Sequence, residues 1–210
     1  MVKSPITGEM RPAAKVPTAD EIVEQLLSHI PDADADMVRR AYDYASAAHA
    51  GQLRLSGDPY IMHPATVAYT LAQMGFDEHS VAAGLLHDTV EDTDSSIDEL
   101  DELFGEQVAD IVDGVTKITM MSFDTKEEAQ AENIRKMILS MAHDIRVPVV
   151  KLADRLHNMS TLDFQKLHKQ QRISKETMDI YAPLANRLGL HKFKQRLEDL
   201  SFRYLQPDAY

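Results

Sequence analysis

Apolar residues recur every three to four positions along most of the chain, which is the period of an amphipathic α-helix. The first stripe ends before Pro31 and consists of Ile22, Val23, Leu26, Leu27 and Ile30. Thr18 and Glu21 precede it with the spacing of a capping box, in which two side chains satisfy backbone groups at a helix start. The same spacing recurs at residues 96–99 and 125–128. The sequence therefore predicts an all-α protein.

Glycine and proline lie mostly between these stripes, where they separate one predicted helix from the next. The segment GQLRLSGDPY, residues 51–60, is rich in turn-forming residues and predicts a loop. The β-branched run RVPVVKL, residues 146–152, fits a strand or a helix, but the ADRLHNM that follows favours a helix. Residues 1–16 are polar and proline-rich, so we expect a flexible arm before a helical domain at residues 17–205.

The composition narrows the range of functions. The chain has 210 residues, with 22 Lys and Arg against 34 Asp and Glu, so its net charge of −12 disfavours nucleic acid or an anionic membrane as a partner. The absence of cysteine excludes disulfides, thiolate chemistry and cysteine-based zinc sites. No apolar run approaches the roughly 18 residues of a membrane span, and the chain does not start like a signal peptide. We therefore expect a cytoplasmic protein.

A His-Asp dipeptide marks the first candidate site. His87 and Asp88 follow the apolar stretch SVAAGLL, and Glu91 and Asp92 follow three to five residues later. If the backbone stays helical, these four polar side chains share one face. Acids beside a buried segment are costly unless a cation or hydrogen bonds satisfy them.

A second His-Asp dipeptide, His143-Asp144, shows that the dipeptide alone decides nothing. It precedes Arg146, and no other candidate ligand lies close to it in the sequence. We expect this second pair at the surface or at a helix cap.

His63 and Asp154 are further candidate ligands at predicted helices. Together with His87 and Asp88 they offer two imidazole nitrogens and two carboxylates, a set that suits Mn²⁺, Fe²⁺ or Zn²⁺ better than Ca²⁺. The residues alone also allow a different interpretation, in which His63 caps a helix, His87 ends one and Asp154 forms a salt bridge.

Six long segments, in order, carry a family resemblance over roughly residues 20–205: GQLRLSGDPYIMHP, AAGLLHDTVEDT, FGEQVADIVDGVTKI, AENIRKM, DIRVPVVKLADRLHNM and ETMDIYAPLANRLGL. They resemble the hydrolase half of the RelA/SpoT-type alarmone enzymes, which are HD-domain phosphohydrolases. The resemblance implies an HD-domain bundle of about ten helices that binds one Mn²⁺. It also implies hydrolysis of ppGpp and pppGpp at the 3′ position, which releases pyrophosphate and GDP or GTP and controls the stringent response.

The resemblance assigns roles to individual residues. The implied metal ligands are His63, His87, Asp88 and Asp154. Glu91 and Asp92 match the catalytic acid pair, in which Glu91 would accept a proton from water and Asp92 would orient it. The implied nucleotide contacts are Arg54, Ser56, Asn158 and Thr161. Arg135 and Lys136 of AENIRKM, and less strongly Lys117, are candidates to neutralise the diphosphate, although exposed cations on helices usually have no specific role.

Two positions depart from the family pattern. Leu55 stands where the family usually has the lysine of RKSG, and Ser160 stands where it usually has the arginine of HNMRTL. The missing lysine is expected against the base or ribose, so base affinity is weaker or the loop is placed differently. Neither change touches the proposed metal ligands.

Two other functions are also considered. One is hydrolysis of a different nucleotide by an HD phosphohydrolase, which the RLSG, DGVTK and LADRLHN segments disfavour. The other is a regulatory HD module that restrains a synthetase, which the intact His87, Asp88, Glu91 and Asp92 disfavour. Long members of the family continue into synthetase and regulatory domains, so residues 206–210 are expected to begin a linker.

Overall fold

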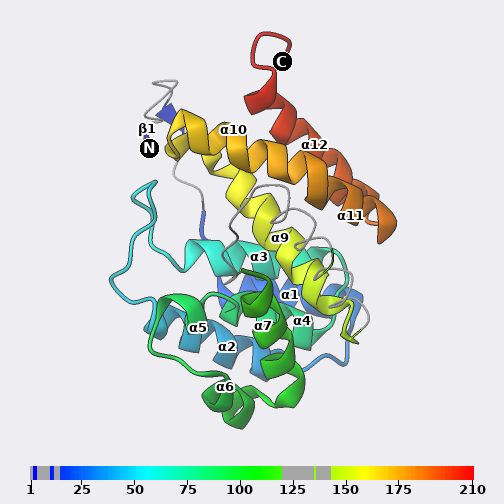
Figure 1. Ribbon diagram of the computed structural model, residues 1–210. Helices are drawn as coiled ribbons and strands as arrows, with labels where there is room; N and C mark the ends of the chain where they lie inside the picture. Colours follow the sequence, from blue (N-terminus) through cyan, green and yellow to red (C-terminus); the bar gives the residue numbers. More distant parts are fainter. Residues whose placement is uncertain (1, 4–9, 12–14, 120–134, 136–142) are drawn as a thin grey trace. The chain divides into compact units, whose positions relative to one another are not determined.

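The computed structural model of the chain (Figure 1) describes residues 2–3, 10–11, 15–119, 135 and 143–210. These residues are almost entirely helical, and the predicted all-α fold is confirmed. None of the described helices is both long and apolar enough to cross a lipid bilayer. The helix predicted to start at residues 125–128 lies outside the described residues.

The chain forms two compact units. The larger unit comprises Lys15–Gln52 and Pro59–Lys151, and the smaller unit comprises Met1–Ala14, Leu53–Asp58 and Leu152–Tyr210. The domain boundaries expected from the sequence are not tested by this division and stay predictions.

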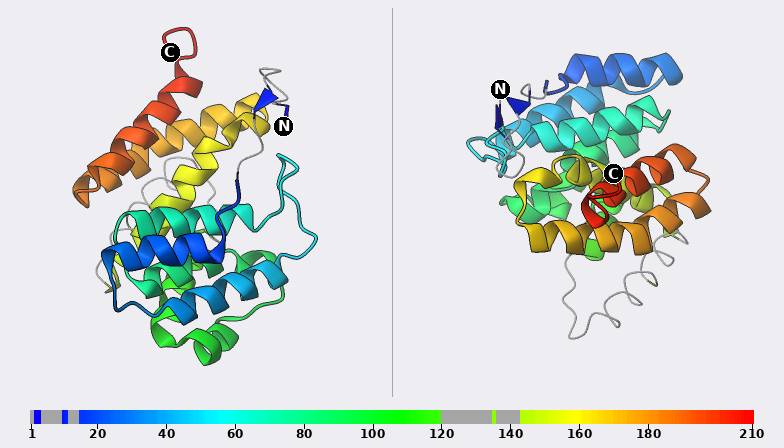
Figure 2. Two further views of the ribbon diagram at one scale, coloured as in Figure 1. Left: turned by 180° about the vertical axis from the view of Figure 1, so that it is seen from behind. Right: turned by 90° about the horizontal axis from the view of Figure 1, so that it is seen from above.

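The larger unit is a bundle built around a buried central helix. Its helices are α1 (Ala19–His29), α2 (Ala35–Ala48), α3 (Met62–Gln73), α4 (Glu78–Leu86), α5 (Thr89–Asp92), α6 (Ile97–Phe104), α7 (Glu106–Thr119) and the first part of α9 (Arg146–Ser160). Helix α4 packs against α2, α3 and α7, and Figure 2 shows from behind that α1 lies along α3. Every residue from Ser80 to Leu86 is buried, so α4 is apolar on all sides because it is surrounded by other helices.

Gly84 permits the close packing of α3 against α4. A Cβ atom on Gly84 would lie 2.7 Å from Cδ1 of Leu71 on α3, which is far closer than van der Waals contact. Any larger residue would therefore push the two helices apart, and such overpacking typically costs about 1 to 3 kcal/mol. The sequence leaves only a hydrogen atom at the point where these two helices meet.

The smaller unit contains the second part of α9 and a long helical hairpin. Its other elements are the 3₁₀ turn η1 (Leu162–Phe164), α10 (Leu167–Glu176), the π-helical turn η2 (Thr177–Tyr181), α11 (Ala182–Arg187) and α12 (His191–Leu205). Helices α10 and α12 lie side by side (Figure 1). Arg155 on α9 joins this hairpin, because its guanidinium pairs with Glu176 at 3.0 Å and stacks 4.0 Å from the centre of the Tyr181 ring.

Two short strands, β1 (Val2–Lys3) and β2 (Met10–Arg11), pair antiparallel within the segment expected to be an arm. The sequence analysis did not predict them. Strands of two residues are too short to show an alternating pattern of apolar and polar positions.

The predicted helix starts are observed where the sequence placed them. Thr18 and Glu21 form a complete capping box at α1, and Ser96 accepts a hydrogen bond from the Glu99 backbone at α6. The ambiguous segment at residues 146–152 lies inside α9, so its interpretation as a helix is confirmed. Its Pro148 lies in the first turn, where the backbone N–H that proline lacks would have no partner within the helix.

Arg146 links the starts of α4 and α9. Its guanidinium donates to both carboxylate oxygens of Asp144 and lies 3.3 Å from Asp77, the residue that caps α4 by accepting from the Ser80 backbone. Burial alone would raise the pKa of Asp77 and of Asp144, but hydrogen bonds from Ser80 and Arg146 and the charge of Arg146 lower both below 3.8. Both carboxylates therefore favour the folded state when ionised.

We expect Arg146→Gln to lower the free energy of unfolding at neutral pH by about 2 kcal/mol, because it removes hydrogen bonds between charged groups. A lowered carboxyl pKa contributes stability above the pKa of the unfolded chain, and this contribution is lost as the pH falls through the folded pKa. The parent should therefore lose stability below about pH 4, and the variant should lose less over the same range. Urea unfolding at several pH values measures this.

The control is Arg196→Gln, which removes the same charge from an exposed position on α12. It should leave both the stability and its acid dependence close to those of the parent. An equal acid dependence in the parent and in Arg146→Gln would show that the cluster does not favour the folded state.

Candidate functional site

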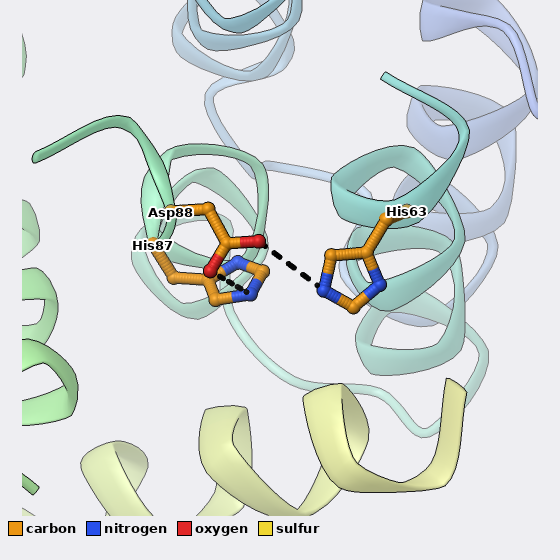
Figure 3. A group of neighbouring side chains, drawn as sticks. All are labelled: His63, His87 and Asp88. Carbon is orange, nitrogen blue, oxygen red and sulfur yellow. Dashed lines mark ion pairs between the residues drawn. The ribbon is translucent and has the colours of Figure 1, made fainter. Parts of the chain in front are cut away.

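The structure brings three of the four predicted metal ligands together in the larger unit (Figure 3). His63 lies in the first turn of α3, and His87 and Asp88 directly follow α4. The Asp88 carboxylate lies between the two imidazoles, with Oδ2 3.3 Å from Nε2 of His63 and Oδ1 3.1 Å from Nε2 of His87. Both histidines are only 1% exposed, whereas Asp88 is half-buried.

A backbone hydrogen bond fixes the orientation of the His87 ring. Its Nδ1 lies 2.9 Å from the carbonyl oxygen of Gly84, which can only accept, so Nδ1 carries the proton. The other ring nitrogen, Nε2, then faces Asp88. A ligand histidine whose other nitrogen donates to a backbone carbonyl is the usual arrangement at metal sites.

The donor set of this cluster fits a divalent cation. Among the described residues, His63, His87 and Asp88 form the one group that offers three ligand atoms within 4.8 Å of one another. Two imidazole nitrogens and one carboxylate oxygen suit Mn²⁺, Fe²⁺ or Zn²⁺ and are a poor match for Ca²⁺, which prefers oxygen ligands. The buried histidines give the site a low dielectric constant, and a cation bound there would neutralise the charge of Asp88.

The predicted acid pair lies on α5, immediately after these ligands. The backbone of His87 and Asp88 stays helical, and the Asp92 amide donates to the Asp88 carbonyl at 2.9 Å. The sequence analysis placed Asp88 and Asp92 on one face if the backbone stays helical, and the backbone is helical here. Glu91 is half-buried and Asp92 is exposed.

Tyr60 connects the ligand to the acid pair and was missed by the sequence analysis. Its hydroxyl lies 2.9 Å from Oδ2 of Asp88 and 2.5 Å from Oδ2 of Asp92. Burial raises the pKa of the Tyr60 hydroxyl, and the charges of Asp88 and Asp92 raise it further. Its position could have drawn attention to it, because Tyr60 lies only three residues before His63 and just before α3 begins.

The fourth predicted ligand, Asp154, lies on α9 in the smaller unit and is 5% exposed. Within that unit the Asn158 amide donates to Asp154 Oδ1, and Arg54 donates to the Asn158 oxygen at 2.7 Å. Two predicted nucleotide contacts and a predicted ligand therefore form one hydrogen-bonded chain. Asn158 and Asp154 meet because they are four residues apart on one helix.

The other predicted nucleotide contacts are half-buried in the same unit. Ser56 accepts from the Asp58 amide in the loop, and Thr161 donates to the carbonyls of His157 and Asn158 at the end of α9. The departure at Leu55 is 71% exposed, so its side chain has no packing role in the fold.

Two of the three predicted diphosphate contacts lie among the described residues, and their role stays a prediction. Lys117 is exposed and pairs with Asp113 one turn earlier on α7, and Arg135 is exposed. Lys136 lies outside the described residues.

The second His-Asp dipeptide has the structural role expected of it. His143 is exposed, and Asp144 accepts from the Arg146 amide at the start of α9. The prediction that this pair lies at the surface and at a helix cap is confirmed.

Residues 41–191 match the model of the HD domain family, and this segment includes all four predicted ligands. The chain belongs to the HD domain family. Its His87 and Asp88 provide the adjacent histidine and aspartate that were singled out in the sequence.

Relatives of this HD domain agree with the resemblance to the RelA/SpoT-type enzymes. The chain is 58% identical over 174 residues to a probable guanosine-3′,5′-bis(diphosphate) 3′-pyrophosphohydrolase of Synechocystis, which covers 83% of the chain and 23% of that protein. It is 48% identical over 191 residues to the bifunctional (p)ppGpp synthase/hydrolase SpoT of Escherichia coli, which covers 90% and 27%. The chain thus spans about a quarter of the length of these relatives.

A solved structure also resembles this HD domain over nearly its full length. It is that of a metazoan ortholog of SpoT, described as hydrolysing ppGpp, with a TM-score of 0.55 and 25% sequence identity. The match covers 93% of this chain and 97% of the metazoan protein. The similarity therefore extends over nearly the whole of both chains.

Removing one ligand should abolish cation binding at this HD domain. We expect His87→Ala to weaken Mn²⁺ binding by more than about 100-fold, since loss of a ligand is more severe than loss of an outer-shell partner. Calorimetric titration with Mn²⁺ measures the affinity, and the rise in melting temperature with added Mn²⁺ gives a second readout. His143→Ala is the matched control and should bind like the parent. Equal binding by His87→Ala and the parent would exclude the proposed centre.

Proposed function

We propose that this HD domain hydrolyses ppGpp and pppGpp at the 3′ position, releasing pyrophosphate together with GDP or GTP, with Mn²⁺ as its cofactor. The observation that carries the proposal is the convergence of His63, His87 and Asp88 beside the acid pair on α5. The activities ascribed to the Synechocystis and metazoan relatives supply the substrate class.

The roles of the acids follow from their position next to the ligands. When bound, a divalent cation supplies Lewis-acid chemistry that polarises a phosphate oxygen and makes water more acidic. Glu91 would accept the proton of the attacking water, and Asp92 would orient that water. A new bond forms between the water oxygen and the phosphorus next to the 3′ oxygen. The bond to the 3′ oxygen breaks, and that oxygen takes up a proton to become the 3′-hydroxyl of GDP or GTP.

The remaining predicted residues receive proposed roles in binding. Asp154 is the proposed fourth ligand. Arg54, Ser56, Asn158 and Thr161 are the proposed nucleotide contacts, and Arg135 and Lys136 the proposed partners of the diphosphate. Because the chain carries a net charge of −12, an anionic substrate needs such local cations.

The setting of the reaction is also a proposal. We infer a cytoplasmic location, which the absence of cysteine supports, because a protein without thiols or disulfides is suited to a reducing compartment. The relatives are about four times longer than the chain, which supports partners in the form of synthetase and regulatory domains in a longer protein.

Product analysis tests the proposal directly. The protein is incubated with ppGpp or pppGpp in the presence of Mn²⁺ or of a chelator, and the nucleotide and pyrophosphate are quantified. We expect GDP or GTP and one pyrophosphate per alarmone with Mn²⁺ and none with chelator. Hydrolysis of a deoxynucleoside triphosphate in place of either alarmone would indicate a different HD phosphohydrolase. Binding of alarmone without turnover would indicate a regulatory module.

Glu91→Gln and Asp92→Asn separate binding from chemistry. Each removes a carboxylate next to the reacting water and leaves the proposed ligands in place, so turnover should fall by roughly 100-fold or more. Calorimetry should show that both variants still bind Mn²⁺. Parental turnover in both variants would show that these acids have no part in the reaction. Loss of Mn²⁺ binding would show that they are metal ligands.

Leu55→Lys restores the cation that the family usually has in this loop. An exposed cation that meets a base or a phosphate contributes about 0.5 to 2 kcal/mol. The KM for ppGpp should therefore fall by a few-fold to about thirtyfold, and kcat should stay nearly constant, because the contact acts equally on ground and transition states. Steady-state kinetics with ppGpp measures both constants.

Leu53→Lys is the control for a general charge effect. Leu53 is 67% exposed and lies on the other side of Arg54 in the same loop. An equal fall in KM for both variants would mean that added charge, and not a contact at position 55, explains the change.

A further inference from the structure

Tyr60 holds a fixed place between a proposed metal ligand and a proposed catalytic acid. Its hydroxyl lies 2.9 Å from Asp88 and 2.5 Å from Asp92, and a distance near 2.5 Å between oxygen atoms is typical of a hydrogen bond to a carboxylate. A phenol has only one proton to donate. The two carboxylates therefore share one hydrogen-bond donor, and a movement of either changes its contact with Tyr60.

The Tyr60 ring is held in place by a stacked histidine. The ring of His49, which follows α2, lies 4.4 Å from the Tyr60 ring centre at an angle of 19°. His49 is only 3% exposed, and its Nδ1 lies 3.0 Å from Oε1 of Gln52. These contacts are those of a packed side chain.

Gln52 completes a closed set of contacts. Its side-chain amide nitrogen donates to the backbone carbonyl of Asp92 at 3.2 Å. The backbone carbonyl of Gln52 accepts from the backbone amide of Tyr60 at 3.0 Å. The side chain of Gln52 thus joins His49 to the backbone of the acid pair. All of these residues belong to the larger unit. The position of the Tyr60 hydroxyl is therefore set by the stacked ring of His49 and by the backbone hydrogen bond to Gln52.

We propose that Tyr60 is a positioning residue that couples the orientation of Asp88 to that of Asp92. Each oxygen of Asp88 faces a different histidine, so the rotation of this carboxylate decides which oxygen an ion beside His63 or His87 would meet. The Tyr60 hydroxyl contacts Oδ2, the same oxygen that faces His63. The hydroxyl also contacts Asp92, so the same group sets the place of the acid relative to the ligand. The role in turnover rests on the proposed function, whereas the role in cation binding does not.

Tyr60→Phe tests this inference, because it removes the hydroxyl and keeps the ring that stacks on His49. Outer-shell partners of metal ligands typically change metal affinity by about 10- to 100-fold, so Mn²⁺ should bind that much more weakly. At saturating Mn²⁺ we expect kcat for ppGpp to stay at least about tenfold below the parent with a nearly unchanged KM, because Asp92 has lost its partner. Calorimetric titration with Mn²⁺ alone and steady-state kinetics give the two readouts.

Tyr204→Phe is the matched control, since the Tyr204 hydroxyl donates to the buried carboxylate of Asp163 in the smaller unit. It should lower the melting temperature and leave Mn²⁺ affinity and kcat unchanged. Parental Mn²⁺ affinity in Tyr60→Phe would overturn the proposed role at Asp88, and parental kcat at saturating Mn²⁺ would overturn the role at Asp92. If the parent binds Mn²⁺ but does not hydrolyse alarmones, the proposed function fails, and the Mn²⁺ titration still decides whether Tyr60 supports Asp88.

Discussion

The contact between α3 and α4 is the constraint on which the site depends. His63 lies in the first turn of α3, and His87 directly follows α4. Their ring nitrogens therefore approach Asp88 together only if the two helices pack closely. Gly84 allows this, because any side chain there would meet Leu71. The carbonyl of the same glycine accepts from His87 and orients its ring. One residue therefore sets both the separation of the helices and the direction of a proposed ligand.

Burial gives this small polar group its chemical character. Two histidines that are almost fully enclosed cannot exchange their contacts for water, so a cation that meets them and Asp88 would be attracted strongly. The acids on α5 lie at the exposed margin of the same group, where water and an anionic substrate can reach them. Such a gradient, from enclosed ligands to accessible acids, suits a hydrolytic site better than a structural metal site.

The sequence predicted the helices and the group His87, Asp88 and Asp92 because these depend on local patterns. His63 lies on another helix, and its side-chain type and the family resemblance associated it with that group. The capping residues Thr18 and Ser96 act within one turn, and the step from Asp88 to Asp92 is a single helical turn. Tyr60 could not be predicted in the same way, since its contacts with Asp92 join residues that are 32 positions apart. The strands β1 and β2 were missed because two residues carry no period.

The hydrogen-bonded chain from Arg54 through Asn158 to Asp154 limits how a nucleotide could use these residues. An amide group has two N–H donors and one oxygen, and Asn158 directs one donor to Asp154 and its oxygen to Arg54. The second N–H of the Asn158 amide is used by neither of these two contacts, so a base or phosphate that approaches Asn158 need not displace Asp154. Two residues proposed to bind the nucleotide thus also hold the side chain of Asp154, so a change at either would disturb that carboxylate as well.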